Sequence, residues 1–567
     1  MDAVITGGEL LARQLKKENV DTVFTLIGNQ VSPTIVYLAE NGIKVIHTRT
    51  ETGAVLMANG WAQASRRAGV AIISGGPGFA NAVSAIIKSY YARTPLVVIT
   101  GAIVPQQRDN GVLAECEQVS LIRPYTKWAC TVYDPARIPE YVSRAIQFSS
   151  TGRKGPVVLE IPINILKQKT EMVHTFDCDL VSSDVSMAVP GKIDAFLNML
   201  SKAKRPIIIA GDEVYYDHAE AELVEFVDLT RIPVYTTSRG RGCIADTHPL
   251  CMGPGRVLEA GPQLYAFRNA DLVITVGLES DYQVENLKPP RFGEKQKLVA
   301  VNKEIFTVIN GNCRPDLVIS GRVDRVLGQI CSRIRELSSQ ENPDFEDWLD
   351  ELKENNRKFW DDLERESICR DTPFLHPLHG LKMIKKMIGQ DALIVLDGSN
   401  AMFWGGLCFD CNYPGQLIYG PDGQFGPMGT GVAVAIGAKA ANPQREVVLY
   451  TGDGSFGFNA LEMDTAVRFN LPVMVFIHND QTWGFCKTTQ EILYGKTEAA
   501  DLGMVRYDKM VEALGGVGGL ATDLNTLEES ITKAKESKLP SCINIMVDKY
   551  AYSPGVHSFN EALKLQK

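Results

Sequence analysis

Short apolar runs rich in Val, Ile and Leu recur along the whole chain, and segments with helical patterning separate them. Such near-continuous apolar strands are typical of parallel sheets, because helices cover both faces of a parallel sheet and every strand residue is buried. The sequence therefore predicts an α/β protein with doubly wound parallel sheets. The runs lie at Val70–Ser74, Leu96–Thr100, Val157–Pro162, Pro206–Gly211, Leu272–Gly277, Leu393–Gly398, Val447–Gly454 and Val473–Asp480.

Two polar stretches with weak patterning, Lys167–Lys192 and Ser338–Pro343, are predicted linkers, and a charged helix exposed on one face is expected over Phe345–Arg365. A chain of 567 residues is long enough for several domains. We expect three of them, over residues 1–170, 190–337 and 370–550. The segments beginning at Val70 and Val447 share the order strand, glycine turn, helix, strand. The first and last domains are therefore expected to be similar units, and the alternative is that the two segments are similar by chance.

Composition excludes several classes of protein. Lys and Arg number 58 against 67 Asp and Glu, a net charge of −9, and there is no dense basic stripe, so a nucleic-acid partner is not expected. No apolar run reaches the roughly 18 residues of a membrane span, and the N-terminus lacks the pattern of a secretory signal. The twelve cysteines are scattered, and the single Cys408/Cys411 pair cannot form a zinc site alone. These features predict a cytoplasmic protein with reduced thiols and no membrane partner.

The strongest chemical signal is a glycine turn with an acid at the end of one predicted strand, followed by an acid at the end of the next. The turn is Gly452-Asp453-Gly454-Ser455, and Asn479-Asp480 follows the next strand. The amides that open the following helix suit a phosphate, and two carboxylates with a backbone carbonyl and phosphate oxygens suit Mg²⁺. The alternative is a tight turn with a capping aspartate. No Gly-Lys-Ser/Thr follows, so the motif is not a P-loop.

These residues resemble the cofactor signature of thiamine-diphosphate-dependent enzymes of the pyruvate decarboxylase and acetolactate synthase superfamily. The resemblance covers nearly the whole chain. The order and spacing of its motifs are similar to those of acetolactate synthases, benzaldehyde lyase and 2-hydroxyacyl-CoA lyases. It implies pyrimidine-binding, central and diphosphate-binding domains in a homodimer or homotetramer with the active site between subunits. The further motifs that carry it are Ile5–Leu10, Glu51 with Ala58–Ala62, Gly76–Gly78, Tyr125–Trp128, Arg239–Gly242, Asp246–Pro249 and Gly426–Gly429.

The resemblance implies a role for each matching position. Mg²⁺ would be held by the side chains of Asp453 and Asp480 and the carbonyl of Thr482, although many relatives have Asn in place of Asp480. Met428 would support the bent thiamine diphosphate. The remaining positions implied to contact the cofactor are Gly398, Ser399, Asn400, Gly426, Gly452, Gly454 and Ser455.

The resemblance implies that Glu51 is the main catalytic residue. Its carboxyl group would hydrogen-bond the pyrimidine ring and favour the imino tautomer that removes the thiazolium proton. It would come from one subunit while the Mg²⁺ site belongs to the other. Relatives commonly have His-Glu where this chain has Thr50-Glu51. The alternative is an acid that complements the dipole of a helix N-terminus.

The type of reaction is inferred from missing histidines. Relatives that are simple decarboxylases place histidines where they protonate the enamine intermediate, but Gly28–Gln30, Ser74–Asn81 and Leu113–Gln118 contain none. Gln30 stands where benzaldehyde lyase has a histidine, so Asn29 and Gln30 are the expected catalytic neighbours. His478 is expected to point into a strand interior or a neighbouring helix. We therefore expect carbon–carbon bond making or breaking on a 2-oxo acid, 2-hydroxy ketone or 2-hydroxyacyl compound.

Substrate and central-domain features refine this expectation. Trp483, Phe485 and Cys486 are expected to face an apolar acyl pocket, and Leu113-Ala114-Glu115 replaces the Phe-Gln-Glu of acetolactate synthases, which puts pyruvate in doubt as donor. The stretch Leu278–Asp281 lacks the arginine of flavin-binding relatives, which argues against FAD. The alternatives left open are a flavin-dependent 2-oxo acid oxidase, a non-oxidative decarboxylase and a non-catalytic cofactor-binding homologue.

Overall fold

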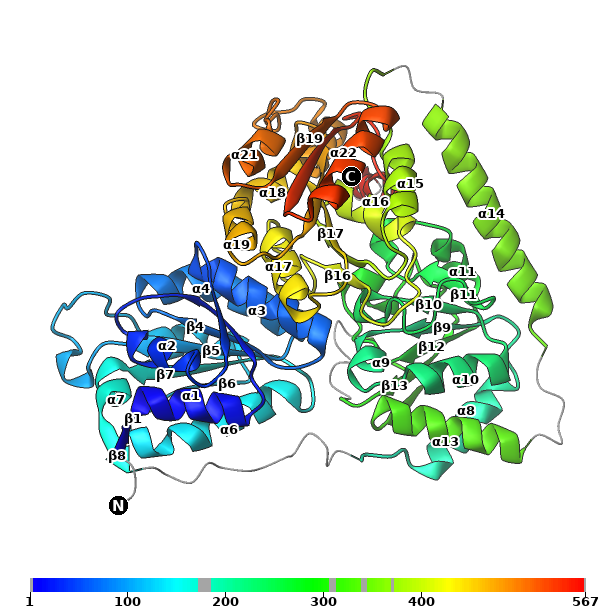
Figure 1. Cartoon of the computed structure of the whole chain (residues 1–567). Helices are drawn as coiled ribbons and strands as arrows, with labels where there is room; N and C mark the ends of the chain where they lie inside the picture. The colour runs from blue at the N-terminus through cyan, green and yellow to red at the C-terminus, as the bar shows by residue number, and fades with distance from the viewer. Residues whose placement is uncertain (1–3, 172–184, 305–312, 338–343, 369–371, 565–567) are drawn as a thin grey trace.

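The computed structural model describes residues 4–171, 185–304, 313–337, 344–368 and 372–564. Within these ranges the chain forms three α/β units, each built on a parallel sheet of six strands with helices on its faces (Figure 1). Every apolar run predicted as a strand forms one, with ends that differ by one or two residues. The prediction of doubly wound α/β domains is confirmed.

The N-terminal sheet has the strand order β3-β2-β4-β5-β7-β6. Its central strands are buried along their whole length because helices cover both faces. Its strands are β2 (Thr22–Leu26), β3 (Lys44–His47), β4 (Gly69–Ile73), β5 (Leu96–Ala102), β6 (Trp128–Thr131) and β7 (Pro156–Pro162). Its helices are α1 (Gly7–Lys17), α2 (Ser32–Leu38), α3 (Glu51–Ser65), α4 (Pro77–Tyr91), α5 (Gln118–Ile122), α6 (Ile138–Ser150) and α7 (Ile163–Lys167). The short β1 (Val4–Thr6) pairs antiparallel with β8 (Lys169–Glu171).

The C-terminal sheet repeats this order in its own strands, β16-β15-β17-β18-β20-β19, so the internal similarity seen in the sequence is a similarity of topology. In both sheets the repeated segment supplies the third and fourth strands, β4 with β5 and β17 with β18. The strands are β15 (Leu393–Asp397), β16 (Leu417–Tyr419), β17 (Val447–Gly452), β18 (Met474–Asn479), β19 (Val517–Ala521) and β20 (Ser541–Met546). The helices are α15 (Pro377–Met387), α16 (Asn400–Cys408), α17 (Gly431–Ala441), α18 (Asp453–Asn459), α19 (Glu462–Arg468), α20 (Gly484–Tyr494), α21 (Tyr507–Ala513), α22 (Leu524–Ser537) and α23 (Pro554–Lys564).

The central sheet has a different order, β11-β10-β9-β12-β13-β14, in which the chain reverses direction across the sheet between β9 and β12. Open α/β sheets commonly bind ligands at the carboxyl ends of the strands at such a switch point. The strands are β9 (Pro206–Ala210), β10 (Val234–Thr236), β11 (Cys251–Pro254), β12 (Leu272–Val276), β13 (Lys297–Asn302) and β14 (Leu317–Ser320). The helices are α8 (Pro190–Leu200), α9 (Asp212–Tyr216), α10 (Glu220–Thr230), α11 (Gln263–Asn269) and α13 (Val323–Glu336).

The expected charged helix is α14 (Glu346–Ile368), which runs along the edge of the molecule from the central to the C-terminal unit (Figure 1). Trp348 packs into the core of the central unit, whereas Leu363 packs into the core of the C-terminal unit. The predicted linker Ser338–Pro343 and residues 172–184 of the predicted linker Lys167–Lys192 lie outside the described residues. The domain boundaries proposed from the sequence stay predictions.

The N- and C-terminal units share one apolar core, in which helices α3 and α17 lie against each other (Figure 1). Their backbones touch at Gly437, where a Cβ would lie 1.9 Å from the carbonyl oxygen of Met57. Only glycine therefore allows this helix pair to approach so closely. The contact aligns the start of α3, at Glu51, with the C-terminal unit.

Gly437→Ala is expected to destabilise the protein, because the new methyl group must push α17 away from α3. Overpacking of this kind costs about 1–3 kcal/mol. The matched control is Gly328→Ala in α13, where a Cβ would meet no atom within 4 Å. The control should hold or raise the thermal unfolding temperature, since Ala is the better helix former. Equal unfolding temperatures for the two variants would contradict the proposed close contact.

Candidate functional site

A narrow cavity of about 50 Å³ lies at the carboxyl ends of β15, β17 and β18 in the C-terminal unit. Neighbouring parallel strands end at one edge of the sheet, so their following turns meet there. Most of the residues that the sequence singled out for cofactor contact line this cavity together. Its lining is Gly398, Ser399, Asn400, Ala401, Met428, Gly452, Asp453, Gly454, Ser455, His478, Asp480, Thr482, Trp483, Gly484, Phe485 and Cys486.

Asp453 and Asp480 form a buried acidic pair in this cavity. Asp453 is the first residue of α18, Asp480 directly follows β18, and both are almost inaccessible. Burial and the nearby charge of Asp480 raise the pKa of Asp453 to about 8, and burial raises the pKa of Asp480 to about 6. Within the described residues the Oδ2 atom of Asp453 has no hydrogen-bond partner. Two buried carboxylates with an unpartnered oxygen are a donor set that suits a hard divalent cation.

The loop after β18 orients the second acid. The Oδ1 atom of Asp480 accepts hydrogen bonds from the Thr482 amide at 3.0 Å and from its hydroxyl group at 2.9 Å. Thr482 in turn makes an isolated backbone bridge with Asp501. The backbone at Thr482 is therefore held beside the acidic pair, where the sequence predicted a carbonyl ligand.

Met428 lies on the loop between β16 and α17 and lines the cavity with 37% of its surface exposed. The Ser399 hydroxyl group lies 3.8 Å from its sulfur. Gly426, on the same loop, is exposed and is not among the described residues that line the cavity. The apolar residue expected to support the cofactor is therefore accessible from the cavity, whereas the contact expected of Gly426 stays a prediction.

Asp397 is a buried residue of this site that the sequence analysis missed. Its carboxylate accepts hydrogen bonds from the amides of Gly398 at 2.6 Å, Gly429 at 3.3 Å and Gly431 at 2.7 Å. Burial raises its pKa to about 6 despite these donors. It thus fastens the C-terminal end of the Met428 loop to the end of β15. An acid at the end of a strand run was the available signal, since Asp453 and Asp480 were found that way.

Asp397→Ala is expected to lower stability, because the three amides lose their common acceptor in a buried place. An unsatisfied buried group costs about 1–3 kcal/mol. Asp397→Asn keeps one acceptor oxygen but turns an NH₂ group toward one of the amides, so its loss should be smaller than that of Ala without vanishing. Urea unfolding of both variants measures the difference, and unchanged stability of Asp397→Ala would contradict the anchoring role.

Glu51 lies apart from this cavity within the chain. It begins α3, is 9% exposed, and its Oε2 accepts a hydrogen bond from the Asn81 amide at 3.1 Å. Neither Glu51, Gln30 nor Asn29 is among the described residues that line the cavity. Thr50, which replaces the usual histidine, caps α3 by accepting a hydrogen bond from the Gly53 amide at 2.9 Å. The structure of one chain therefore does not bring the predicted catalytic and metal-binding residues together.

Gln30 is bound into the turn after β4. Its Oε1 accepts hydrogen bonds from the Gly75 amide at 2.7 Å and the Ser74 hydroxyl group at 3.3 Å. Its side chain is half-buried, whereas Asn29 is exposed. The carbonyl end of the Gln30 amide is thus committed to the backbone.

Glu462, a second residue that the sequence analysis missed, holds the segment before Glu51. This buried acid on α19 accepts hydrogen bonds from the Arg49 amide at 3.2 Å and from the Thr50 amide at 3.0 Å. It therefore ties the start of α3 to the C-terminal unit. Nothing in the sequence marked it, since a glutamate on a short helix reads as a solvated side chain.

His478 is buried and contacts the neighbouring helix α16 at Asn400, as predicted. It also lines the cavity, which the sequence did not indicate. Its Nδ1 lies 2.9 Å from the Tyr450 hydroxyl group. Burial lowers the pKa of His478 to about 3, so the ring is neutral near pH 7. Strand alternation alone could not distinguish a buried ring from one that also borders a cavity.

The chain that forms this site matches known protein families. Three family models match in order: the thiamine pyrophosphate enzyme N-terminal TPP binding domain over residues 5–121, the central domain over 193–330, and the C-terminal TPP binding domain over 397–545. The chain is also 31% identical over 557 residues to the acetolactate synthase large subunit IlvG of Mycobacterium tuberculosis, with 96% of each chain covered. The chain belongs to the thiamine pyrophosphate enzyme family.

Other members of the family resemble the chain over nearly its full length. The 2-hydroxyacyl-CoA lyase 2 of Caenorhabditis elegans is 27% identical over 593 residues, covering 97% of this chain and 90% of that protein. A probable acetolactate synthase large subunit of Methanococcus aeolicus is 27% identical over 569 residues, covering 96% and 92%. The chain is thus a thiamine-diphosphate-dependent enzyme of the carboligase and lyase type.

Three further observations concern the described part of this family member. None of its helices is both long and apolar enough to cross a membrane. Its ten described cysteines are free thiols, Cys408 and Cys411 included. Trp483, Phe485 and Cys486 line the cavity beside the acidic pair, at the place where the sequence expected an apolar pocket.

Proposed function

We propose that this enzyme binds thiamine diphosphate and Mg²⁺ in the cavity of its C-terminal unit and makes or breaks a carbon–carbon bond next to a carbonyl group. The observation that carries the proposal is the unpartnered Oδ2 atom of buried Asp453 beside Asp480. In this arrangement Asp453, Asp480 and the Thr482 carbonyl would hold the metal ion. Gly452, Gly454 and Ser455, at the start of α18, would receive the diphosphate.

We further propose that a complete site needs two copies of the chain. The supporting observation is that the described lining of the cavity comes from the C-terminal unit, whereas Glu51 lies outside it and is hydrogen-bonded to Asn81 of its own N-terminal unit. Glu51 of one subunit would then face the cavity of the other in a homodimer or homotetramer. Glu462 supports this role, because it fixes the start of α3 and so the position of Glu51 relative to its own C-terminal unit.

The roles of the chain's own groups follow from their contacts. When bound, thiamine diphosphate supplies a stabilised carbanion that attacks or releases a carbonyl carbon. Glu51, oriented by the Asn81 amide, would hold a proton at the pyrimidine ring. Met428 would contact the cofactor and support its bent shape. The carbonyl oxygen of the Gln30 side chain is held by the Gly75 amide, so its NH₂ group is the part available to a substrate.

The substrate is proposed to be a 2-oxo acid, a 2-hydroxy ketone or a 2-hydroxyacyl compound. Support comes from relatives that are named as acetolactate synthases and as 2-hydroxyacyl-CoA lyases. Trp483 and Phe485 would offer an apolar surface to the acyl group. The neutral ring of His478 lacks the charged proton that a decarboxylase-type proton donor would supply. We propose a cytoplasmic location, which suits the free thiols.

Two experiments test the proposal. Calorimetric titration with thiamine diphosphate should show binding that requires Mg²⁺, and binding that ignores Mg²⁺ would contradict the metal site. Incubation of the loaded enzyme with a panel of 2-oxo acids, hydroxy ketones and 2-hydroxyacyl thioesters, read by mass spectrometry, should show joined or cleaved products. A purified protein that carries flavin would favour the 2-oxo acid oxidase instead.

A further inference from the structure

The loop that carries Met428 is buried at both ends and exposed in its middle. Residues 421–423 and 429–430 are buried, whereas 424–426 and Met428 are exposed. Asp397 fastens the C-terminal end of this loop within the C-terminal unit. The N-terminal end is held differently, by residues of the other two units.

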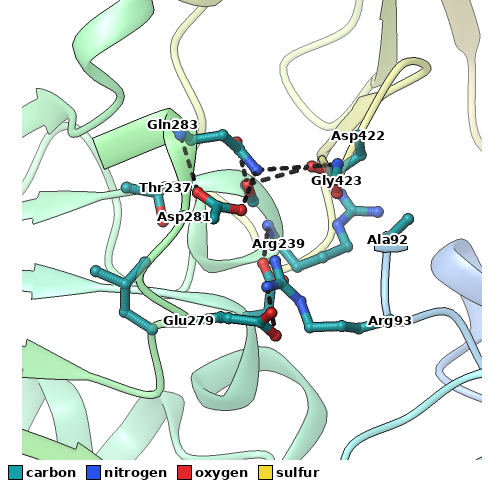
Figure 2. Close-up of polar contacts among 12 residues, drawn as sticks. Ala92, Arg93, Thr237, Arg239, Glu279, Asp281, Gln283, Asp422 and Gly423 are labelled. Carbon is teal, nitrogen blue, oxygen red and sulfur yellow. Dashed lines mark hydrogen bonds and ion pairs between the residues drawn. The ribbon is translucent and has the colours of Figure 1, made fainter. Parts of the chain in front are cut away.

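Asp422 provides the first of these contacts. Its side chain is 1% exposed, and its Oδ1 accepts a hydrogen bond from the Gln283 amide at 3.3 Å and lies 3.5 Å from the Ser238 hydroxyl group. Both residues belong to the central unit, as Figure 2 shows for Gln283. The amide of Gly423, the next residue, donates to the same oxygen at 2.9 Å. This buried carboxylate oxygen thus takes the Gln283 and Gly423 amides as donors and lies beside the Ser238 hydroxyl group, whose one hydrogen is closer to Gln283. It joins the loop to the central unit.

Gln283 is itself fixed before it reaches Asp422. Its backbone amide and its side-chain NH₂ group donate to Asp281 at 2.9 and 3.2 Å, and its carbonyl oxygen accepts from Ser238 at 2.8 Å (Figure 2). All the polar groups of this side chain are therefore used. A side chain held in this way presents its remaining hydrogen to Asp422 in one orientation, which limits the entropy lost on forming the contact.

The N-terminal unit also contacts this end of the loop. Gly423 adopts a φ of +78°, and a Cβ there would lie 2.4 Å from the carbonyl carbon of Tyr91, so the two backbones touch. The Phe425 ring stacks on the Tyr91 ring, with centroids 6.4 Å apart and an interplanar angle of 15°. The C-terminal end of α4 thus packs against the loop.

Arg93 holds that end of α4 against the central unit. Its guanidinium group forms ion pairs with Asp212 at 2.5 Å and Glu279 at 3.0 Å, and all three side chains are buried (Figure 2). Burial opposes the charge of Arg93, but these acids outweigh it and raise its pKa well above the usual range. A buried ion pair is costly to break because the remaining charge has no partner. This network fills the switch point between β9 and β12 with the chain's own side chains.

We propose that Asp422 is a positioning residue for the thiamine diphosphate site. It anchors the Met428 loop to Ser238 and Gln283 of the central unit, and the central unit thereby determines the position of the Met428 side chain in the cavity. The inference rests on the proposed function, because it takes Met428 as a cofactor contact. It gives the central unit a part in cofactor binding although, of the described residues, none from that unit lines the cavity.

The test compares binding of thiamine diphosphate with binding of inorganic pyrophosphate, both with saturating Mg²⁺, by calorimetry. Asp422→Ala should weaken thiamine diphosphate binding about tenfold, the factor that corresponds to roughly one hydrogen bond. Pyrophosphate binding should stay within about twofold, because the metal end of the cavity does not depend on Met428. Asp422→Asn keeps the acceptor oxygen and should bind nearly as the unmodified enzyme does.

A second variant approaches the same contact from the central unit. Gln283→Met removes the donor to Asp422 and should weaken thiamine diphosphate binding in the same way. The double variant should lose less affinity than the two single losses combined, because the contact between Asp422 and Gln283 is removed in both single variants. The matched control is Asp391→Ala, an exposed acid in the turn before β15.

The outcomes separate the alternatives. Unchanged thiamine diphosphate affinity in folded Asp422→Ala would overturn the inference, and so would an equal loss of affinity for both ligands, which indicates a merely structural role. Additive losses in the double variant would also overturn it. Failure of the unmodified enzyme to bind thiamine diphosphate would instead overturn the proposed function, and this inference with it.

Discussion

Asp453→Asn is expected to abolish Mg²⁺-dependent binding of thiamine diphosphate. The substitution replaces a buried carboxylate in the cavity, whose Oδ2 atom has no hydrogen-bond partner among the described residues, by an amide group that has no charge to offer a cation. Loss of a residue that only supports a metal ligand costs about 10–100-fold in metal affinity, so loss of a ligand should cost at least about 100-fold. Calorimetric titration of the variant with Mg²⁺ and thiamine diphosphate measures this loss.

The stability of the same variant should move in the opposite direction. Burial raises the pKa of both Asp453 and Asp480, and the nearby charge of Asp480 raises that of Asp453 further. Removing one charge should therefore raise the unfolding temperature of the protein prepared without metal. Asp391→Asn, an exposed acid, should change neither quantity. Retained Mg²⁺-dependent binding in Asp453→Asn would refute the metal site.

Glu51→Gln is expected to bind thiamine diphosphate but to lose most of its activity. Gln keeps the size of the side chain and can still contact Asn81, but it cannot share a proton with the pyrimidine ring. General acid–base groups contribute about 10²–10⁴-fold to rates, and kcat should fall within that range. Glu40→Gln, at an exposed position, is the control and should keep full activity. Full activity of Glu51→Gln would leave only the alternative of a helix N-terminal charge.

Mixing the two inactive variants tests whether the site is shared between subunits. A dimer that pairs Glu51→Gln with Asp453→Asn has one site with both defects and one site with neither. Random reassociation should therefore restore roughly a quarter of the activity of the unmodified enzyme. No recovery after verified exchange of subunits would show that Glu51 and Asp453 serve a site within a single chain.

Much of the fold could be predicted from the sequence because its signals are local. A buried parallel strand is a short apolar run, and Leu393–Asp397 or Met474–Asn479 needs no distant partner to be recognised. The acids at 453 and 480 could be paired in advance because both follow strands that are neighbours in a doubly wound sheet. The family resemblance, rather than strand order, implied that Met428, Ser399 and Asn400 would meet them, and all three line the same cavity.

Two of the residues that reasoning from sequence missed act through partners far away in the chain. Glu462 holds the start of α3, more than four hundred positions earlier, and Asp422 meets Gln283 of another unit. Periodicity carries no information about such pairs, and charged residues outside a motif are normally solvated. That the buried His478 also borders the cavity was missed for a related reason, since the alternation of a strand does not reveal where a cavity will form.

The sequence by itself thus determined the α/β class, the family and the acidic pair at neighbouring strand ends, because hydrophobic period and strand-end position are properties of short segments. Only the tertiary structure decided that Asp397 and Asp422 hold opposite ends of the Met428 loop, and that Glu51 lies apart from the cavity of its own chain. Those facts depend on how three units pack together, and burial turns ordinary acids into anchors only after that packing has excluded water from them.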